Sequence, residues 1–140
     1  MTKALIDTNV IIDIALKRQP FYQDAVNVFK QISEQKLLGY ISATIVTDVF
    51  YLLRKASGQE KALAFLHELI TIVDVIGVDK RTIINALSLN WADFEDAVQA
   101  QTAIENELDV IITRNTKDYQ PLSKIQIVSP SNYSGLTKLV

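Results

Sequence analysis

The sequence contains no cysteine and a single histidine, His67, and these absences exclude several kinds of chemistry. Without cysteine the chain has no disulfide scaffold, no thiol nucleophile and no zinc site with cysteine ligands. One histidine is too few for a zinc cluster built on histidines. Glycine and proline number only 4 and 3, so we expect no flexible linker between domains.

Long apolar segments are also missing. No run approaches the roughly 20 residues of a membrane-spanning helix. Met1-Thr2-Lys3 leads directly into a short apolar run, so we expect no signal peptide. From these two features we expect a cytoplasmic protein with no membrane partner.

The chain lacks the excess of positive charge that is typical of a strongly basic nucleic-acid binder. Lysine and arginine together number 14 against 16 aspartates and glutamates, which gives a net charge of −2 at pH 7. A nucleic-acid partner would need metal ions that offset the local negative charge, or basic residues gathered in one place.

The length of 140 residues fits one domain. By the scaling of surface with mass, a chain of this size buries about 68% of its unfolded surface, which is enough for a hydrophobic core. We therefore predict a single domain over residues 1–140 that needs no disulfide or structural metal.

Hydrophobic periodicity predicts alternating strands and helices. Short apolar runs predict strands at residues 4–6, 39–42, 72–76, 110–113 and 125–128. Apolar residues at helical spacing predict helices at 10–15, 25–32, 45–56, 62–70, 80–89 and 93–104. This alternation indicates an α/β fold with a parallel sheet and helices on both faces. In such sheets, ligands bind beyond the carboxyl ends of the strands.

Acidic side chains occur where this fold would place a ligand. Asp7 directly follows the first strand, and Asp118 lies five residues beyond Thr113, after a late strand. Asp93 and Asp96 open the helix that precedes that strand. We expect these three regions to converge at one edge of the sheet.

Asp48 lies on the flank of an apolar helical stripe, three residues after Ile45 and four before Leu52. Loss of hydration there costs several kcal/mol unless something compensates the charge, and a divalent cation would do so. Carboxylates without histidine or cysteine suit Mg²⁺, which prefers oxygen ligands. Such ions activate water in phosphodiester hydrolysis.

Each acid also has a purely structural interpretation. Asp93 is expected to cap the helix that follows it, since another acid comes three residues later. Asp7 can equally cap a helix, and Asp118 can be an ordinary turn residue. We expect Asp13 and Asp24 to be solvated acids on helix surfaces.

Four segments together resemble the motifs of the PIN-domain family, and in particular the toxin of a bacterial VapBC-type toxin–antitoxin pair. In chain order, they are Ala4 to Asp13, Ser42 to Asp48, Asp93 to Ala97, and Ile112 to Tyr119. The similarity runs nearly from end to end. It departs from the family pattern at two positions: the family usually has Glu in place of Asp48, and some members have Asp in place of Asn115.

The resemblance implies a three-layer, PIN-like (Rossmann-like) fold with a central parallel sheet of about four to five strands. It also implies a Mg²⁺ or Mn²⁺ site, hydrolysis of single-stranded RNA by two-metal-type water activation, a homodimer and a small antitoxin partner. It assigns catalysis and metal binding to Asp7, Asp48, Asp96 and Asp118. It places the following residues beside the metal or the substrate: Thr8, Asn9, Thr113, Arg114 and Asn115.

Two other functions remain open from the sequence. A binding module would keep the fold while Asp48 and Asn115 weaken the metal site. A haloacid-dehalogenase-like phosphatase would also place an aspartate after the first strand, but its signature requires a second aspartate where this chain has Asn9. If the carboxylates do gather, their mutual repulsion should raise pKa values, and metal binding should release protons and stabilise the fold.

Overall fold

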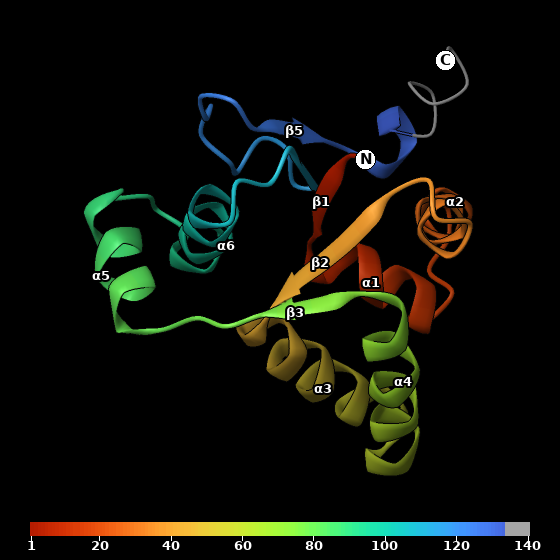
Figure 1. The fold of residues 1–140 in the computed structure, drawn as a ribbon. Coiled ribbons are helices and arrows are strands. Elements are labelled where there is room, and N and C mark those ends of the chain that lie inside the picture. Colours follow the sequence, from red (N-terminus) through yellow and green to blue (C-terminus); the bar gives the residue numbers. More distant parts are fainter. Residues whose placement is uncertain (134–140) are drawn as a thin grey trace.

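A parallel sheet of five strands forms the centre of the computed structural model, which describes residues 1–133 (Figure 1). The strand order is β3-β2-β1-β4-β5. The chain therefore adds β2 and β3 on one side of β1 and then β4 and β5 on its other side. The predicted parallel sheet is confirmed. The strands are β1 (Lys3–Ile6), β2 (Leu38–Ser42), β3 (Asp74–Ile76), β4 (Val110–Ile112) and β5 (Gln126–Val128).

Within residues 1–133, the helices α1 to α6 cover the two faces of the sheet (Figure 1). The first four pack together on one face, and the last two form a pair on the other face. The helices are α1 (Thr8–Ala15), α2 (Tyr22–Ser33), α3 (Ala43–Ser57), α4 (Gln59–Ile72), α5 (Lys80–Ser88) and α6 (Phe94–Glu105).

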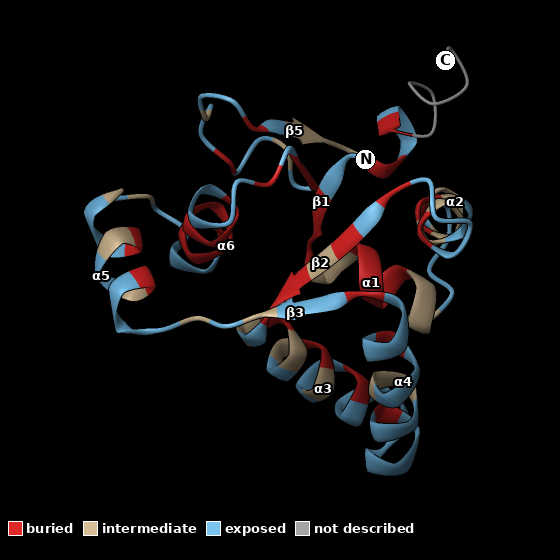
Figure 2. Cartoon of the chain, in the orientation of Figure 1, coloured by how far each residue is buried: buried red, intermediate tan, exposed pale blue. Residues whose placement is uncertain are grey.

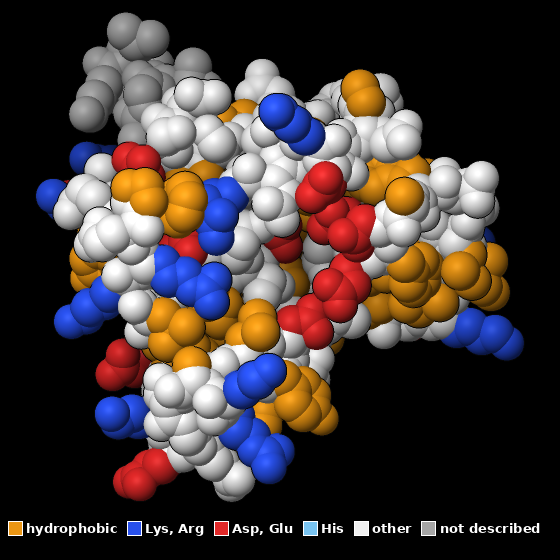
Figure 3. All heavy atoms as spheres, turned by 180° about the vertical axis from the view of Figure 1, so that it is seen from behind, with side chains coloured by type: hydrophobic (Ala, Val, Ile, Leu, Met, Phe, Trp, Pro, Cys, Tyr) orange, Lys and Arg blue, Asp and Glu red, His pale blue; other side chains and the backbone are white. Residues whose placement is uncertain are grey.

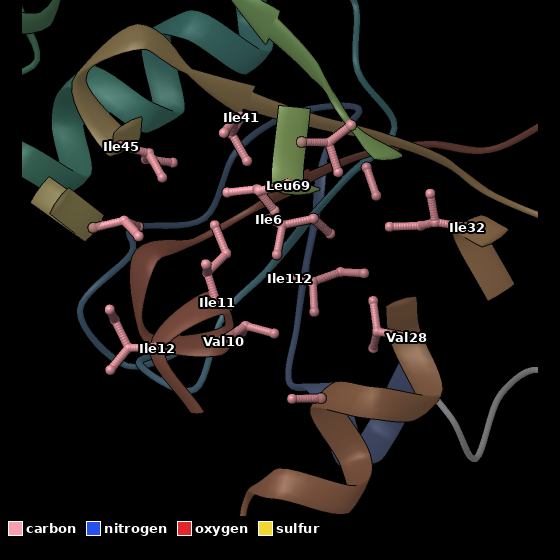
Figure 4. Close-up of a cluster of buried hydrophobic side chains, with 14 of the residues drawn as sticks. Ile6, Val10, Ile11, Ile12, Val28, Ile32, Ile41, Ile45, Leu69 and Ile112 are labelled. Carbon is pink, nitrogen blue, oxygen red and sulfur yellow. The ribbon is translucent and has the colours of Figure 1, made fainter. Parts of the chain in front are cut away.

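The two central strands, β1 and β4, are buried on both faces, which explains their nearly continuous apolar sequence. Successive side chains of a strand point to opposite faces. Ile6 and Ile112 accordingly pack against α1 to α4, whereas Leu5 and Ile111 pack against α6. Figure 2 shows the buried residues on the central strands and on the helix faces turned toward them, and Figure 4 shows part of the larger core.

One predicted strand begins at the wrong residue. The apolar run from Ile72 predicts a strand, but α4 continues through Ile72, and the N–H of Val73 donates to Leu69 O over 3.1 Å. Leu69 and Val73 are four residues apart, which places both on the buried face of a helix. This packing keeps the segment helical despite its β-branched residues, and β3 begins only at Asp74. Within residues 1–133, no helix combines the length and the apolar character needed to cross a membrane.

Candidate active site

Acidic side chains from both helical layers meet beyond the carboxyl end of β1. They line an open cavity of about 420 Å³, to which α3 contributes from one face of the sheet and α6 from the other. Figure 3 shows the Asp and Glu side chains gathered around a hollow, with Lys and Arg side chains to one side. The carboxylates that line the cavity are Asp7, Asp48, Asp93, Glu95 and Asp96.

Asp7 is the most firmly positioned of these acids. It caps α1: its Oδ1 accepts from the N–H of Thr8 over 2.8 Å. Its Oδ2 accepts from the Thr113 hydroxyl over 2.8 Å and from the Tyr119 hydroxyl over 3.3 Å. Burial raises the pKa of Asp7, while the hydrogen bonds from Thr113, Thr8 and Tyr119 act to lower it. Asp7 therefore caps α1 and also lies in the cavity where the resemblance expects a metal-binding acid.

Thr113 links Asp7 to the loop that follows β4. Its Oγ1 accepts from Asn9 Nδ2 and from the N–H of Asn115, both over 3.1 Å, while it donates to Asp7. Asn9 Oδ1 in turn accepts from the N–H of Arg114 over 3.0 Å. Asn9 and Thr113 therefore hold the Asp7 carboxylate and the loop in one fixed arrangement.

The prediction that Asp13 is a solvated acid is wrong. Asp13 is fully buried, and its carboxylate accepts from Arg114 Nε over 2.6 Å and from Arg114 Nη2 over 3.1 Å. The guanidinium also lies 3.9 Å from the centre of the Phe21 ring. Burial of Asp13 is possible because a bidentate arginine neutralises it. Arg114 has further N–H donors that Asp13 does not use, and its place beside the substrate stays a prediction.

Asp96 lies in the first turn of α6, directly after the cap that the sequence predicts. Asp93 Oδ1 accepts from the N–H of Asp96 over 3.1 Å, which confirms Asp93 as the cap. Asp96 itself is buried, and its Oδ2 has no hydrogen-bond partner among the described residues. Burial, followed by the charges of Asp7, Asp93, Asp118 and Glu95, raises the pKa of Asp96 to about 7.

Asp48 reaches the cavity from α3 and is partly exposed. Burial and then the charge of Asp7 raise its pKa. The charge of Asp48 is the largest cause of the raised pKa of Glu95, and both carboxylates line the cavity. The sequence analysis did not single out Glu95, although its position between Asp93 and Asp96 was available as a signal.

Asp118 does not join the other carboxylates in the cavity lining. It is exposed, and its N–H donates to Asn115 O over 3.0 Å in a turn after β4. It is near enough to raise the pKa of Asp96. Asn115 and Thr8 do line the cavity, as does Asn9.

Two further residues of the site were missed by the sequence analysis. Tyr119 is buried, and burial together with the charge of Asp7 raises its pKa, so its hydroxyl remains a donor to Asp7. Its ring packs edge-on against Trp91, with ring centres 5.9 Å apart. Gln99 lines the cavity one helical turn after Asp96. Tyr119 ends the fourth family-like segment, but the sequence gives no signal that its hydroxyl contacts Asp7, and a glutamine within a helix carries no recognisable signal of a site.

The cavity lies within a recognised family domain. The family model described as a PIN domain matches residues 3–117, which include Asp7, Asp48 and Asp96. The chain belongs to the PIN-domain family. It is also similar to a protein named Ribonuclease VapC1 from Aquifex aeolicus (strain VF5), with 27% identity over 124 residues that cover 85% of both proteins.

Solved structures agree with the fold. VapBC2 from Rickettsia felis, bound to a DNA fragment from its promoter, matches with a TM-score of 0.71 and 14% identity, over 91% of this chain and 98% of that chain. A toxin–antitoxin complex from Klebsiella pneumoniae matches with a TM-score of 0.67 and 24% identity, over 91% and 97%. These likenesses establish the PIN-like fold of the chain.

The donor set of the cavity fits a hard divalent cation. Its acids supply oxygen ligands only, and Asp96 Oδ2 is a buried acceptor that no donor satisfies within the described part of the chain. No three His, Cys, Asp or Glu side chains in residues 1–133 form a ready-made ligand group. Mg²⁺ does not require one, because one or two carboxylates and several waters commonly hold it.

Proposed function

We propose that this protein is a metal-dependent endoribonuclease that hydrolyses phosphodiester bonds of single-stranded RNA, and that it is the toxin of a toxin–antitoxin pair. The observation that carries the proposal is the gathering of Asp7, Asp48 and Asp96 around one cavity of a PIN domain. Similarity to a relative named as a ribonuclease supports the reaction.

In this proposal Asp7, Asp48 and Asp96 hold Mg²⁺ or Mn²⁺, and Asp118 acts from the rim of the cavity. The chemistry that such an ion would supply here is activation of a water and stabilisation of the leaving oxygen, which would make a protein base unnecessary. Thr113 and Tyr119 fix the Asp7 carboxylate by donating to its Oδ2.

The surroundings of the cavity suit a substrate that carries phosphates. Thr8, Asn9 and Asn115 offer neutral polar groups beside the acids, and Arg18 lines the same cavity. Arg114 lies in the adjoining loop with N–H donors that Asp13 does not use. The bound cation would offset the acidic lining, which otherwise repels RNA.

We further propose that a small antitoxin protein binds this chain, and that the chain forms a homodimer in the cytoplasm. Support for the antitoxin comes from similarity to a solved toxin–antitoxin complex. A basic side chain of the antitoxin would complement the acidic cavity and inhibit the enzyme. Exposed apolar side chains, among them Tyr51, Ile84 and Leu87, are available for association. Light scattering of the purified chain tests the dimer.

The central experiment is cleavage of a labelled single-stranded RNA with Mn²⁺, Mg²⁺ or EDTA. We expect cleavage with either metal and none with EDTA. Asp7→Asn should abolish it, while Asp74→Asn, an exposed acid on β3, should retain it. Equal cleavage by the Asp7→Asn protein would indicate a contaminant. Absence of cleavage across several RNAs, with normal Mn²⁺ binding, would favour a binding module.

A further inference from the structure

Two buried oxygens without a hydrogen-bond partner lie on the same face of α6. They are Oδ2 of Asp96 and Oε1 of Gln99, and among the described residues these are the only buried side-chain polar atoms left unpaired. Residues three apart on a helix are neighbours, and both side chains line the acidic cavity. Gln99 is only 3% exposed, so bulk water does not satisfy its oxygen.

The amide of Gln99 is held in a fixed orientation. Its Nε2 donates to Thr44 Oγ1 over 3.0 Å, and this hydroxyl is 2.9 Å from Ser42 Oγ. Ser42 caps α3 by accepting from the N–H of Ile45 over 3.3 Å. Gln99 Nε2 is thus anchored to the start of a helix from the opposite face of the sheet, and Oε1 is left without a protein donor.

No donor of the described residues reaches Gln99 Oε1, although donors occur elsewhere in the cavity lining. Asp96, three residues earlier on the helix, and the other acids of the lining are acceptors when ionised. Burial of an unpaired amide oxygen is costly, so such an atom calls for a ligand that carries positive charge or donates hydrogen bonds. A hydrated divalent cation does both, and amide oxygens are common ligands of hard cations.

We propose that Gln99 is a metal-binding residue, whose Oε1 joins Asp96 Oδ2 in the oxygen shell of the divalent cation, and that Thr44 holds the amide in the binding orientation. The inference rests on the proposed function, because it requires a cation in this cavity. A neutral oxygen adds a ligand without adding to the repulsion among the five carboxylates of the lining.

The test is titration of the metal-free protein with MnCl₂ in a calorimeter, beside the rise in melting temperature that MnCl₂ causes. Gln99→Met, which keeps the length of the side chain but removes the oxygen, should weaken Mn²⁺ binding about tenfold. Gln99→Glu, which keeps an oxygen ligand but adds a charge to the lining, should bind Mn²⁺ more tightly than Gln99→Met. Thr44→Val should weaken binding by a smaller factor, since the amide loses its anchor.

Gln101→Met is the matched control. Gln101 lies on the same helix and is also buried, but its Nε2 donates to Glu105 over 3.1 Å and it does not line the cavity. This variant should bind Mn²⁺ as the unmodified chain does. An equal loss in both methionine variants would overturn the inference, because it would show an effect of helix packing.

The remaining outcomes separate this inference from the proposed function. Unchanged Mn²⁺ affinity in Gln99→Met would overturn the role of Gln99 and leave the ribonuclease intact. Absence of Mn²⁺ binding by the unmodified chain would overturn the metal site itself, and the proposed mechanism with it. If Gln99→Met fails to fold, the Thr44→Val titration decides, and an affinity equal to that of the unmodified chain overturns the inference.

Discussion

Arg114 Nε lies 2.6 Å from Oδ2 of the fully buried Asp13, and this ion pair ties the loop after β4 to α1. The two residues are 101 positions apart in the chain. Because Thr113 directly precedes Arg114, the same pair also holds the hydroxyl that donates to Asp7. The ion pair is therefore both a part of the core and a support for the candidate active site.

Removing the arginine should destabilise the protein strongly. Arg114→Met leaves the Asp13 carboxylate buried without a partner, and we expect the free energy of unfolding to fall by about 3 kcal/mol in urea denaturation. Lys61→Met, at an exposed position of α4, should change it by less than about 0.5 kcal/mol. The double variant Asp13→Leu/Arg114→Met should recover much of the loss. A double variant as unstable as Arg114→Met would contradict this account.

Removing the Thr113 hydroxyl should weaken metal binding through Asp7. Thr113→Val takes a donor from Asp7 Oδ2 and an acceptor from Asn9 Nδ2 and the N–H of Asn115. Partners that orient a metal ligand typically contribute 10–100-fold to affinity, so we expect Mn²⁺ binding to weaken by about tenfold in calorimetry. Thr113→Ser retains the hydroxyl and is the control. Identical affinities of the valine and serine variants would refute the role.

The fold was predictable from the sequence to the extent that it depends on local pattern. The apolar runs of β1 and β4 and the position of Asp7 directly after β1 suffice to predict a parallel sheet with an acidic edge. The burial of Asp13 was not predictable, because the neutralising Arg114 comes from a distant segment. The role of Tyr119 was not predictable either, because its hydrogen bond to Asp7 depends on how the loop after β4 folds back.

The family resemblance assigns metal binding to both Asp118 and Asp96, but the structure gives the two acids different surroundings. Asp118 is exposed and outside the cavity lining, whereas Asp96 is buried within it. We expect Asp118→Asn to weaken Mn²⁺ binding by less than about threefold, since water screens an exposed charge. Asp96→Asn should weaken it by more than about tenfold. Calorimetry of both variants checks this. A larger loss in Asp118→Asn would show that the loop closes over the cation.

The pH dependence of stability gives a test that needs no RNA. Burial and neighbouring charges raise the pKa of Asp96 in the folded protein from its ordinary 3.8 to about 7. Between these values the folded protein binds more protons than the unfolded chain, so the metal-free protein should lose stability as pH rises from about 4 to about 7. The raised pKa values of Asp7, Asp48 and Glu95 act in the same direction.

Urea denaturation in EDTA across this pH range measures the effect. Asp96→Asn should reduce the loss of stability with rising pH, because one of the titrating acids is removed. Saturating Mn²⁺ should oppose the trend, because the cation and the protons compete for the same carboxylates, and its stabilisation should therefore grow with pH. Stability in EDTA that rises from pH 5 to pH 7, or a slope that Asp96→Asn leaves unchanged, would show that these acids are ionised in the folded protein without a cation. The repulsion that we infer around the cavity would then be absent, and the need for a bound ion to relieve it would disappear.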